Sequence, residues 1–230
     1  MTTFALVHGA YHGAACWDLL VPELEARGHE AVAMDLPAPD PTAGVNEYAD
    51  AVITALKGVG NDVIVVGHSM GGLTIPLVAD RRPVQRLVFL AALLSAPGKT
   101  GTEVLATYPD GSINPAMATA GVDNGDGTAS MPDDFAAELF FHDCSPDLAA
   151  WAVSVLRPQG WKVVADPLPI DAWPSVPQTY IACQDDRTLT IAFQRALAKE
   201  RGMDLVEVPG SHSPFLSRPS ALADILTALA

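Results

Sequence analysis

The chain has 230 residues, of which 49% are apolar, and a formal net charge of −14 at pH 7, which fits one domain, or one domain with an insertion, around a large core. The negative charge argues against nucleic acid or an anionic membrane as a partner, and no apolar run reaches the roughly 18 residues needed to span a bilayer. The three cysteines are far apart and the first residues show no signal peptide, so we expect a reducing cytoplasm and no disulfide framework.

The first half of the chain alternates between strands and helices. Short apolar, β-branched runs predict strands, and amphipathic segments that end at glycine predict helices. In chain order the elements are a strand at 4–8, a helix at 17–27, a strand at 30–36, a helix at 45–57, a strand at 62–67, a helix at 71–80 and a strand at 84–94. This alternation predicts a parallel sheet with helices on both faces.

The alternation stops between residues 96 and 175. The run Asp-Asn-Gly-Asp-Gly at 123–127 predicts a hairpin turn, since it lacks the glycine placement and final glutamate of a calcium-binding EF-hand. Helical patterns follow at 133–141 and at 146–156, the second with Ser145 as its N-cap. We therefore predict a mainly helical lid, residues 96–175, inserted into an α/β core formed by residues 1–95 and 176–230. Alternation resumes in that core with a strand at 178–183, a helix at 190–201, a strand at 205–208 and a helix at 219–229.

The segment Gly-His-Ser-Met-Gly-Gly at 67–72 directly follows a buried strand. A serine between glycines on a strand-to-helix turn is the layout of a nucleophile elbow. The tight turn forces Ser69 into a strained backbone conformation and leaves its hydroxyl exposed at the end of the sheet. The Met70 N–H points toward the same space, which makes it a candidate donor for an oxyanion hole.

A serine nucleophile needs a base within hydrogen-bond reach, and the base needs an orienting acid. With such an elbow the chain order is serine, acid, histidine, and only His212 of the six histidines follows the last strand that can carry the acid. Asp185 and Asp186 both follow the strand at 178–183, and strand alternation does not distinguish them. For the second oxyanion donor, the N–H of Ala10 in the loop after the first strand is the best candidate.

These residues resemble the α/β-hydrolase fold, and more narrowly the branch that contains plant methylesterases, salicylate-binding esterases and hydroxynitrile lyases. The resemblance covers nearly the whole chain and is carried by HGAYHGAACW at 8–17, GHSMGG at 67–72, CQDD at 183–186 with FQ at 193–194, and GSHSPF at 210–215. It implies that Asp186 is the acid, because the acid of that branch stands seven residues before the Phe of the Phe-Gln pair. It also implies that Ala10 supplies an oxyanion N–H, and that the sheet is mostly parallel with six strands.

Two departures from the lyases favour ester chemistry. The lyases carry a lysine directly after the catalytic histidine, where this chain has Ser213, and a hydroxyl in the first loop, where it has Gly9. We expect a serine hydrolase that cleaves a small carboxylic ester with an apolar or aromatic portion through an acyl-enzyme. The alternatives are a cofactor-independent lyase or C–C bond hydrolase using the same triad, and a weakly catalytic binding protein for an aromatic acid.

Candidate substrate contacts are aromatic residues of the predicted lid and one histidine of the first loop. Ordinary packing is the competing interpretation for each of them. They are Phe140, Phe141, Trp151, Trp161 and His12. We expect no cofactor and no metal, because no Cys/His cluster has zinc-like spacing. The expected partner is a small-molecule ester, and the sequence leaves formation of a homodimer open.

Overall fold

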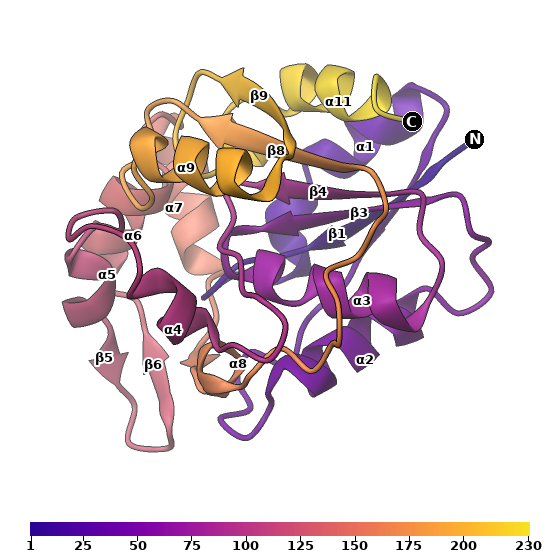
Figure 1. Ribbon diagram of the computed structural model, residues 1–230. Helices are drawn as coiled ribbons and strands as arrows, with labels where there is room; N and C mark the ends of the chain where they lie inside the picture. The colour runs from indigo at the N-terminus through magenta and orange to yellow at the C-terminus, as the bar shows by residue number, and fades with distance from the viewer.

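The computed structural model describes residues 1–230, apart from the side chain of Ala118. At its centre lies a six-stranded parallel sheet in the order β2-β1-β3-β4-β8-β9 (Figure 1). The strands are β1 (Thr3–Val7), β2 (Glu30–Ala33), β3 (Val63–His68), β4 (Arg86–Leu90), β8 (Gln178–Cys183) and β9 (Asp204–Val208). The six-stranded parallel sheet that the resemblance implied is therefore confirmed.

Helices cover both faces of this sheet. The core helices are η1 (Ala14–Trp17), α1 (Leu20–Ala26), α2 (Val45–Ala55), η2 (Ser69–Leu73), α3 (Ile75–Arg81), α9 (Ile191–Arg201), α10 (Pro214–Ser217) and α11 (Pro219–Thr227), of which η1 and η2 are 3-10 helices. α1 packs against α11 and α2 against α3, and the two pairs lie on opposite sides of the strands (Figure 1). The inner strands β1 and β3 are wholly buried, whereas the edge strands β2 and β9 are partly exposed, as expected of a sheet covered on both faces.

Several core elements differ from the sequence prediction: the strand predicted at 30–36 ends at Ala33, and the helix predicted at 17–27 is divided into η1 and α1. The strand predicted to end at residue 94 ends at Leu90, because Ala91 takes a φ of 42° and this left-handed conformation breaks the extended backbone. The helix predicted at 71–80 is divided into η2 and α3. Pro76 lies in the first turn of α3, where a proline is accommodated because its missing N–H has no partner within the helix there.

Residues 96–175 connect β4 to β8, and we call them the inserted segment. They form α4 (Gly101–Leu105), α5 (Ala116–Thr119), α6 (Asp133–Phe140), α7 (Pro146–Ser154), α8 (Lys162–Ala165) and a small antiparallel sheet of β5 (Val122–Asp123), β6 (Thr128–Ser130) and β7 (Gln159–Gly160). Figure 1 shows α4 to α7 and the β5–β6 hairpin at the left, beyond the ends of β1, β3 and β4. Among the helices that the structure describes, none has the length and apolar character to cross a membrane.

The local signals in the inserted segment predicted its turns correctly. β5 and β6 form a hairpin around residues 123–127, and the Asp126 carboxylate accepts the Thr128 N–H at 2.9 Å within the turn. The predicted N-cap of α7 is also confirmed, since the Ser145 hydroxyl accepts the Leu148 N–H at 3.3 Å. Asp126 therefore stabilises its own turn.

Candidate active site

The turn between β3 and η2 holds Ser69 in a strained conformation. Its φ is 50°, in the left-handed region that residues other than glycine rarely adopt, which matches the strain predicted from the motif. The turn is also crowded. A Cβ atom on Gly71 would lie 2.7 Å from the carbonyl oxygen of Val7, and one on Gly9 would lie 2.7 Å from the Ser69 Cβ. Only glycine fits at these two positions, and the Ser69 side chain is left at the edge of a cavity.

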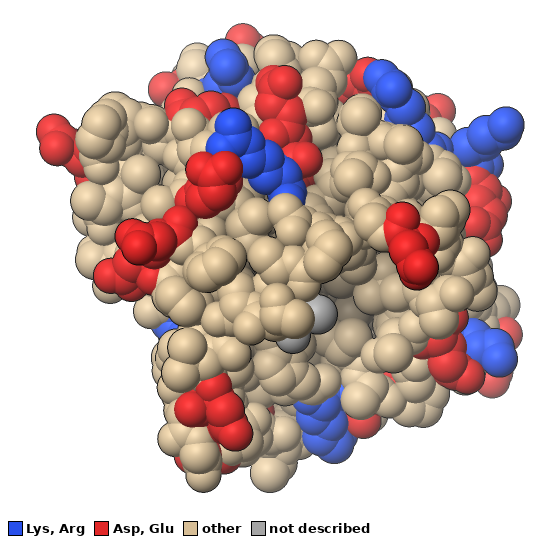
Figure 2. Space-filling model, turned by 90° about the vertical axis from the view of Figure 1, so that its left-hand side faces the viewer, with Lys and Arg blue, Asp and Glu red and all other residues tan. Residues whose placement is uncertain are grey.

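This cavity has a volume of about 290 Å³. Residues of the core and of the inserted segment share its wall: Ala10, Ser69, Met70, Leu93, Leu105, Ile113, Asn114, Pro115, Met117, Trp161, Val164, Thr188 and Leu189. Within the part of the chain that the structure describes, this wall contains neither a cationic nor an acidic side chain. Around the hollow near the centre of the face shown in Figure 2, the described residues at the rim are likewise uncharged. The cavity therefore suits an uncharged, mainly apolar ligand.

His212 lies on the loop between β9 and α10, and it is paired with a carboxylate. Its Nδ1–H donates to Oδ2 of Asp186 at 2.8 Å, and neither side chain is more than 1% exposed. The backbone carbonyl of His212 accepts the Nε2–H of His68 at 2.9 Å, and the two imidazole centroids are 4.6 Å apart. The His212–Asp186 pair is thus packed against the residue that directly precedes Ser69.

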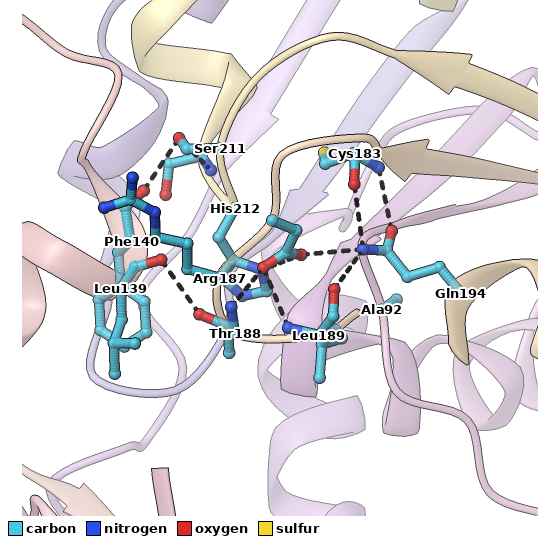
Figure 3. A network of polar contacts seen from close by, with 12 residues as sticks. Ala92, Leu139, Phe140, Cys183, Arg187, Thr188, Leu189, Gln194, Ser211 and His212 are labelled. Carbon is cyan, nitrogen blue, oxygen red and sulfur yellow. Dashed lines mark hydrogen bonds and ion pairs between the residues drawn. The ribbon is translucent and has the colours of Figure 1, made fainter. Parts of the chain in front are cut away.

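Three further donors hold the Asp186 carboxylate (Figure 3). Its Oδ1 accepts the backbone N–H groups of Thr188 at 2.7 Å and Leu189 at 3.0 Å. Its Oδ2 accepts the Nε2–H of Gln194 at 3.0 Å. Because Thr188 and Leu189 also line the cavity, one loop both fixes the carboxylate and forms part of the cavity wall.

Gln194 is a site residue to which the sequence interpretation gave no role. Its wholly buried side chain accepts the Cys183 N–H at 3.0 Å and donates to the Leu189 carbonyl at 2.8 Å as well as to Asp186 (Figure 3). It therefore ties the end of β8 to the loop that carries Asp186. The only signal in the sequence was the Phe-Gln pair quoted for the family resemblance.

The neighbouring Asp185 faces a different group. Its Oδ2 accepts the N–H of Gly210 at 3.0 Å, and its own N–H donates to the Gly210 carbonyl at 3.0 Å. Asp185 thus supports the loop that leads to His212, whereas Asp186 contacts the imidazole ring itself. The structure separates the two carboxylates that strand alternation could not distinguish.

Ala10, in the cavity wall next to Ser69, belongs to a peptide group that a buried histidine holds. The Gly9 carbonyl accepts the Nδ1–H of His8 at 2.9 Å, and the Leu36 N–H donates to His8 Nε2 at 3.0 Å, which fixes this tautomer. Burial lowers the pKa of His8 to about 4, so its ring is neutral. Because the C=O and N–H of a trans peptide point in opposite directions, this bond aims the Ala10 N–H away from His8.

The five predicted substrate contacts occupy three different places. Trp161 lines the cavity and is 38% exposed. Phe140 is buried, with its ring 5.4 Å from that of His12 and 5.8 Å from that of His212. The other three line a narrow crevice of their own: His12, Phe141 and Trp151.

Most of the cavity wall in the inserted segment was not anticipated. Leu105, Ile113 and Val164 are ordinary apolar residues, and no pattern distinguishes them from core residues in the sequence.

No group of three or more His, Cys, Asp or Glu side chains in the described part of the chain is arranged to hold a metal ion.

The chain is similar to known proteins over nearly its whole length. A model of the alpha/beta hydrolase family matches residues 4–225. A pyrethroid hydrolase of Sphingobium wenxiniae is 32% identical over 98% of this chain and 86% of its own length, and the esterase PIR7B of Oryza sativa is 31% identical over 99% and 95%. A solved pyrethroid hydrolase from Sphingobium faniae superposes with a TM-score of 0.87 at 28% identity, covering 99% of this chain and 96% of that one.

Proposed function

Because this chain belongs to the alpha/beta hydrolase family, we propose that it is a serine hydrolase that cleaves small, uncharged carboxylic esters through an acyl-enzyme intermediate. The observation that carries the proposal is the buried hydrogen bond between His212 and Asp186, which packs against His68, the residue that directly precedes the strained Ser69. The similarity to a pyrethroid hydrolase and to an esterase over nearly the whole chain supports ester cleavage.

In the first half of the reaction, Ser69 Oγ attacks the ester carbonyl carbon while His212 Nε2 accepts the hydroxyl proton. Asp186 holds the imidazole in the tautomer with its proton on Nδ1 and stabilises the imidazolium that forms. The N–H groups of Ala10 and Met70 donate to the oxygen that becomes negative. Collapse of this intermediate breaks the bond to the alcohol, which leaves with the proton from His212.

In the second half, a water molecule attacks the acyl group on Ser69. His212 takes one proton from that water and returns it to Ser69 Oγ as the acyl bond breaks. The acid is released and the free serine is restored, so that one ester and one water give one acid and one alcohol. The same two N–H donors serve both tetrahedral intermediates.

The cavity wall defines the substrate class. Its described residues are apolar apart from Ser69, Asn114 and Thr188, so an ester with uncharged, apolar groups on both sides of the carbonyl fits best. Because the described residues of that wall include no cation to pair with a carboxylate, the product acid is held weakly, which disfavours the binding-protein alternative. In this assignment the inserted segment is a lid, and its residues in the cavity wall determine the specificity for the ester.

Turnover of a panel of methyl, aryl and short-chain p-nitrophenyl esters tests the proposal. Ser69→Ala should lower kcat by about 10⁵-fold or more, because the nucleophile and base of a triad act as a unit. A fluorophosphonate probe should label the wild type at Ser69, as read by peptide mass spectrometry. Ser154→Ala on α7, at an exposed serine far along the inserted segment, is the matched control and should leave kcat unchanged.

Full esterase activity in Ser69→Ala, or labelling at another residue, would refute the assignment of Ser69. Tight binding of an aromatic acid without turnover of any ester would instead favour the binding protein. Turnover of a cyanohydrin or a C–C substrate in the absence of ester cleavage would favour the lyase or C–C hydrolase.

A further inference from the structure

The peptide group between Ala10 and Tyr11 is held by buried side chains at both its carbonyl and its N–H. His12 Nδ1 donates to the Ala10 carbonyl at 2.7 Å. On the other side of the same peptide, the Tyr11 N–H donates to Oε1 of Gln159 at 3.2 Å. His12 is 2% exposed and Gln159 is wholly buried. Because a peptide group is planar, these two bonds fix the orientation of the plane next to Ala10.

Tyr11 is itself in an unfavourable conformation that its neighbours impose. Its φ is 63°, and such a left-handed residue other than glycine persists only where the surroundings hold it. Besides the bond to Gln159, the Tyr11 carbonyl accepts the Arg157 N–H at 2.7 Å. The Tyr11 ring packs edge-on against Trp161 at 5.6 Å. Residues 157–161 of the inserted segment therefore hold Tyr11 by its N–H, its carbonyl and its ring.

The orientation of the Gln159 amide is determined by its other partners. Nε2 donates to the Tyr48 hydroxyl at 2.9 Å and also to the Gly160 carbonyl. The Gly160 carbonyl can only accept, so the atom beside it must be the amide nitrogen, and Oε1 is the atom that faces the Tyr11 N–H. The backbone of β7 is anchored as well, since the Gly160 N–H donates to the Ala38 carbonyl at 2.7 Å. The acceptor for Tyr11 is thus fixed by contacts with the core.

From this geometry we infer that Gln159 is a positioning residue of the oxyanion hole: its Oε1 holds the Tyr11 N–H and thereby keeps the Ala10 N–H aimed into the cavity. The inference rests on the proposed function, in which Ala10 donates to the developing oxyanion. Gln159 does not touch the substrate and acts through the backbone of the loop at 9–12. The inserted segment then has a second task besides forming the cavity wall, which is to hold part of the catalytic geometry.

Gln159→Leu tests this inference by removing the acceptor at similar side-chain size. We expect kcat to fall about 10- to 100-fold, below the 10²–10³ loss seen when an oxyanion donor is deleted. KM should stay within about threefold, because the interaction strengthens in the transition state. The affinity for a trifluoromethyl ketone should fall by the same factor as kcat, since its adduct with Ser69 places an oxyanion in the same hole.

Three variants separate positioning from a general loss of structure. Gln159→Asn keeps an amide that is too short to reach Tyr11, so it should behave like the leucine variant. Gln159→Glu keeps an acceptor oxygen for the Tyr11 N–H but loses the donor to the Gly160 carbonyl, so it should recover part of kcat per folded molecule relative to the leucine variant. Tyr48→Phe removes only the outer hydrogen bond and should change kcat less than threefold. The folded fraction of each variant, measured by circular dichroism, normalises kcat.

Wild-type kcat and ketone affinity in folded Gln159→Leu and Gln159→Asn would overturn the inference. So would a loss that merely follows the folded fraction, with no change in ketone affinity per folded molecule. These outcomes are distinguishable from failure of the proposed function, because that failure appears in the wild type and in Ser69→Ala. An enzyme that depends on Ser69 but not on Gln159 would retain the hydrolase assignment and lose only the positioning role.

Discussion

The core and the inserted segment differ in how they are built and in what they contribute to the site. The core strands β1 and β3 are wholly buried in a six-stranded sheet, and the core supplies all the groups to which we assign chemistry. The inserted segment consists of helices of four to nine residues and strands of two or three, and it supplies much of the cavity wall. We therefore expect core substitutions to slow every ester alike, and wall substitutions to change the choice of ester.

Among the variants that test this comparison, the largest loss of kcat should come from replacing Asp186, the acid supplied by the core. Asp186→Asn should lower kcat by about 10⁴-fold, or roughly 5 kcal/mol, because the wrong imidazole tautomer is then favoured. Every ester of a panel should lose rate by a similar factor. Asp185→Asn is the matched control, since this carboxylate contacts the Gly210 backbone and not the ring, and it should lose far less. A larger loss in Asp185→Asn would move the acid assignment to that residue.

The loss of folding stability at acid pH should also originate in the core, in histidines close to the turn that carries Ser69. Burial lowers the pKa of His8 to about 4 and that of His12 to about 3, from an ordinary 6.5, so the unfolded chain binds more protons than the folded one below pH 6.5. The free energy of unfolding should then fall as pH decreases from 6.5 toward 4, by about 3 kcal/mol per pH unit for the two groups together. Burial also lowers the pKa of His68, so this residue should add to the same loss of stability.

Urea unfolding at intervals from pH 7 to pH 4.5 measures this dependence. His12→Asn keeps a side-chain donor at the position of Nδ1 for the Ala10 carbonyl but removes one titrating group, and should reduce the slope by about 1.4 kcal/mol per pH unit. An unchanged slope would place the acid-sensitive groups outside this cluster, and so contradict its origin in the core.

The smallest effect should come from the cavity wall of the inserted segment. Val164→Ala enlarges the cavity, so kcat/KM for an ester with one or two extra carbons should rise about tenfold relative to a short one, in line with the 1–3 kcal/mol associated with a methylene in an apolar pocket. The rate for the short ester should change little. Val153→Ala on α7, which lies outside the described cavity wall, is the control and should leave the ratio unchanged. If Val164→Ala instead lowered kcat/KM for every ester by the same factor, the cavity wall would affect the catalytic step itself and not only the choice of ester.

Predictability from sequence differs between the two regions for physical reasons. β8 was predicted with its observed bounds, because a buried parallel strand is a short apolar run between turns. β4 was predicted too long, since the apolar run continues past Ala91 although the backbone turns there. Local periodicity reports burial, and it does not report a single left-handed residue.

For the site residues too, the sequence predicts what depends on local motifs and does not predict what depends on contacts across the fold. The serine elbow and its chain order were readable because each motif is local. The separation of Asp185 from Asp186 depends on contacts with Gly210 and His212 across the fold, and came only from the resemblance. The contact between Gln159 and Tyr11 joins residues 148 positions apart, on a strand of two residues that has no pattern at all.

The anchoring of Tyr11 by residues 157–161 limits how this enzyme can be redesigned by exchanging segments. A segment grafted from a relative in place of residues 96–175 would bring its own pocket shape, yet it would replace the partners of both the Tyr11 N–H and the Tyr11 carbonyl. A transplant that keeps native residues 157–161 and replaces only the stretch before them preserves those partners. The workable crossover point therefore lies inside the inserted segment, before Arg157, and not at the junction of that segment with β8.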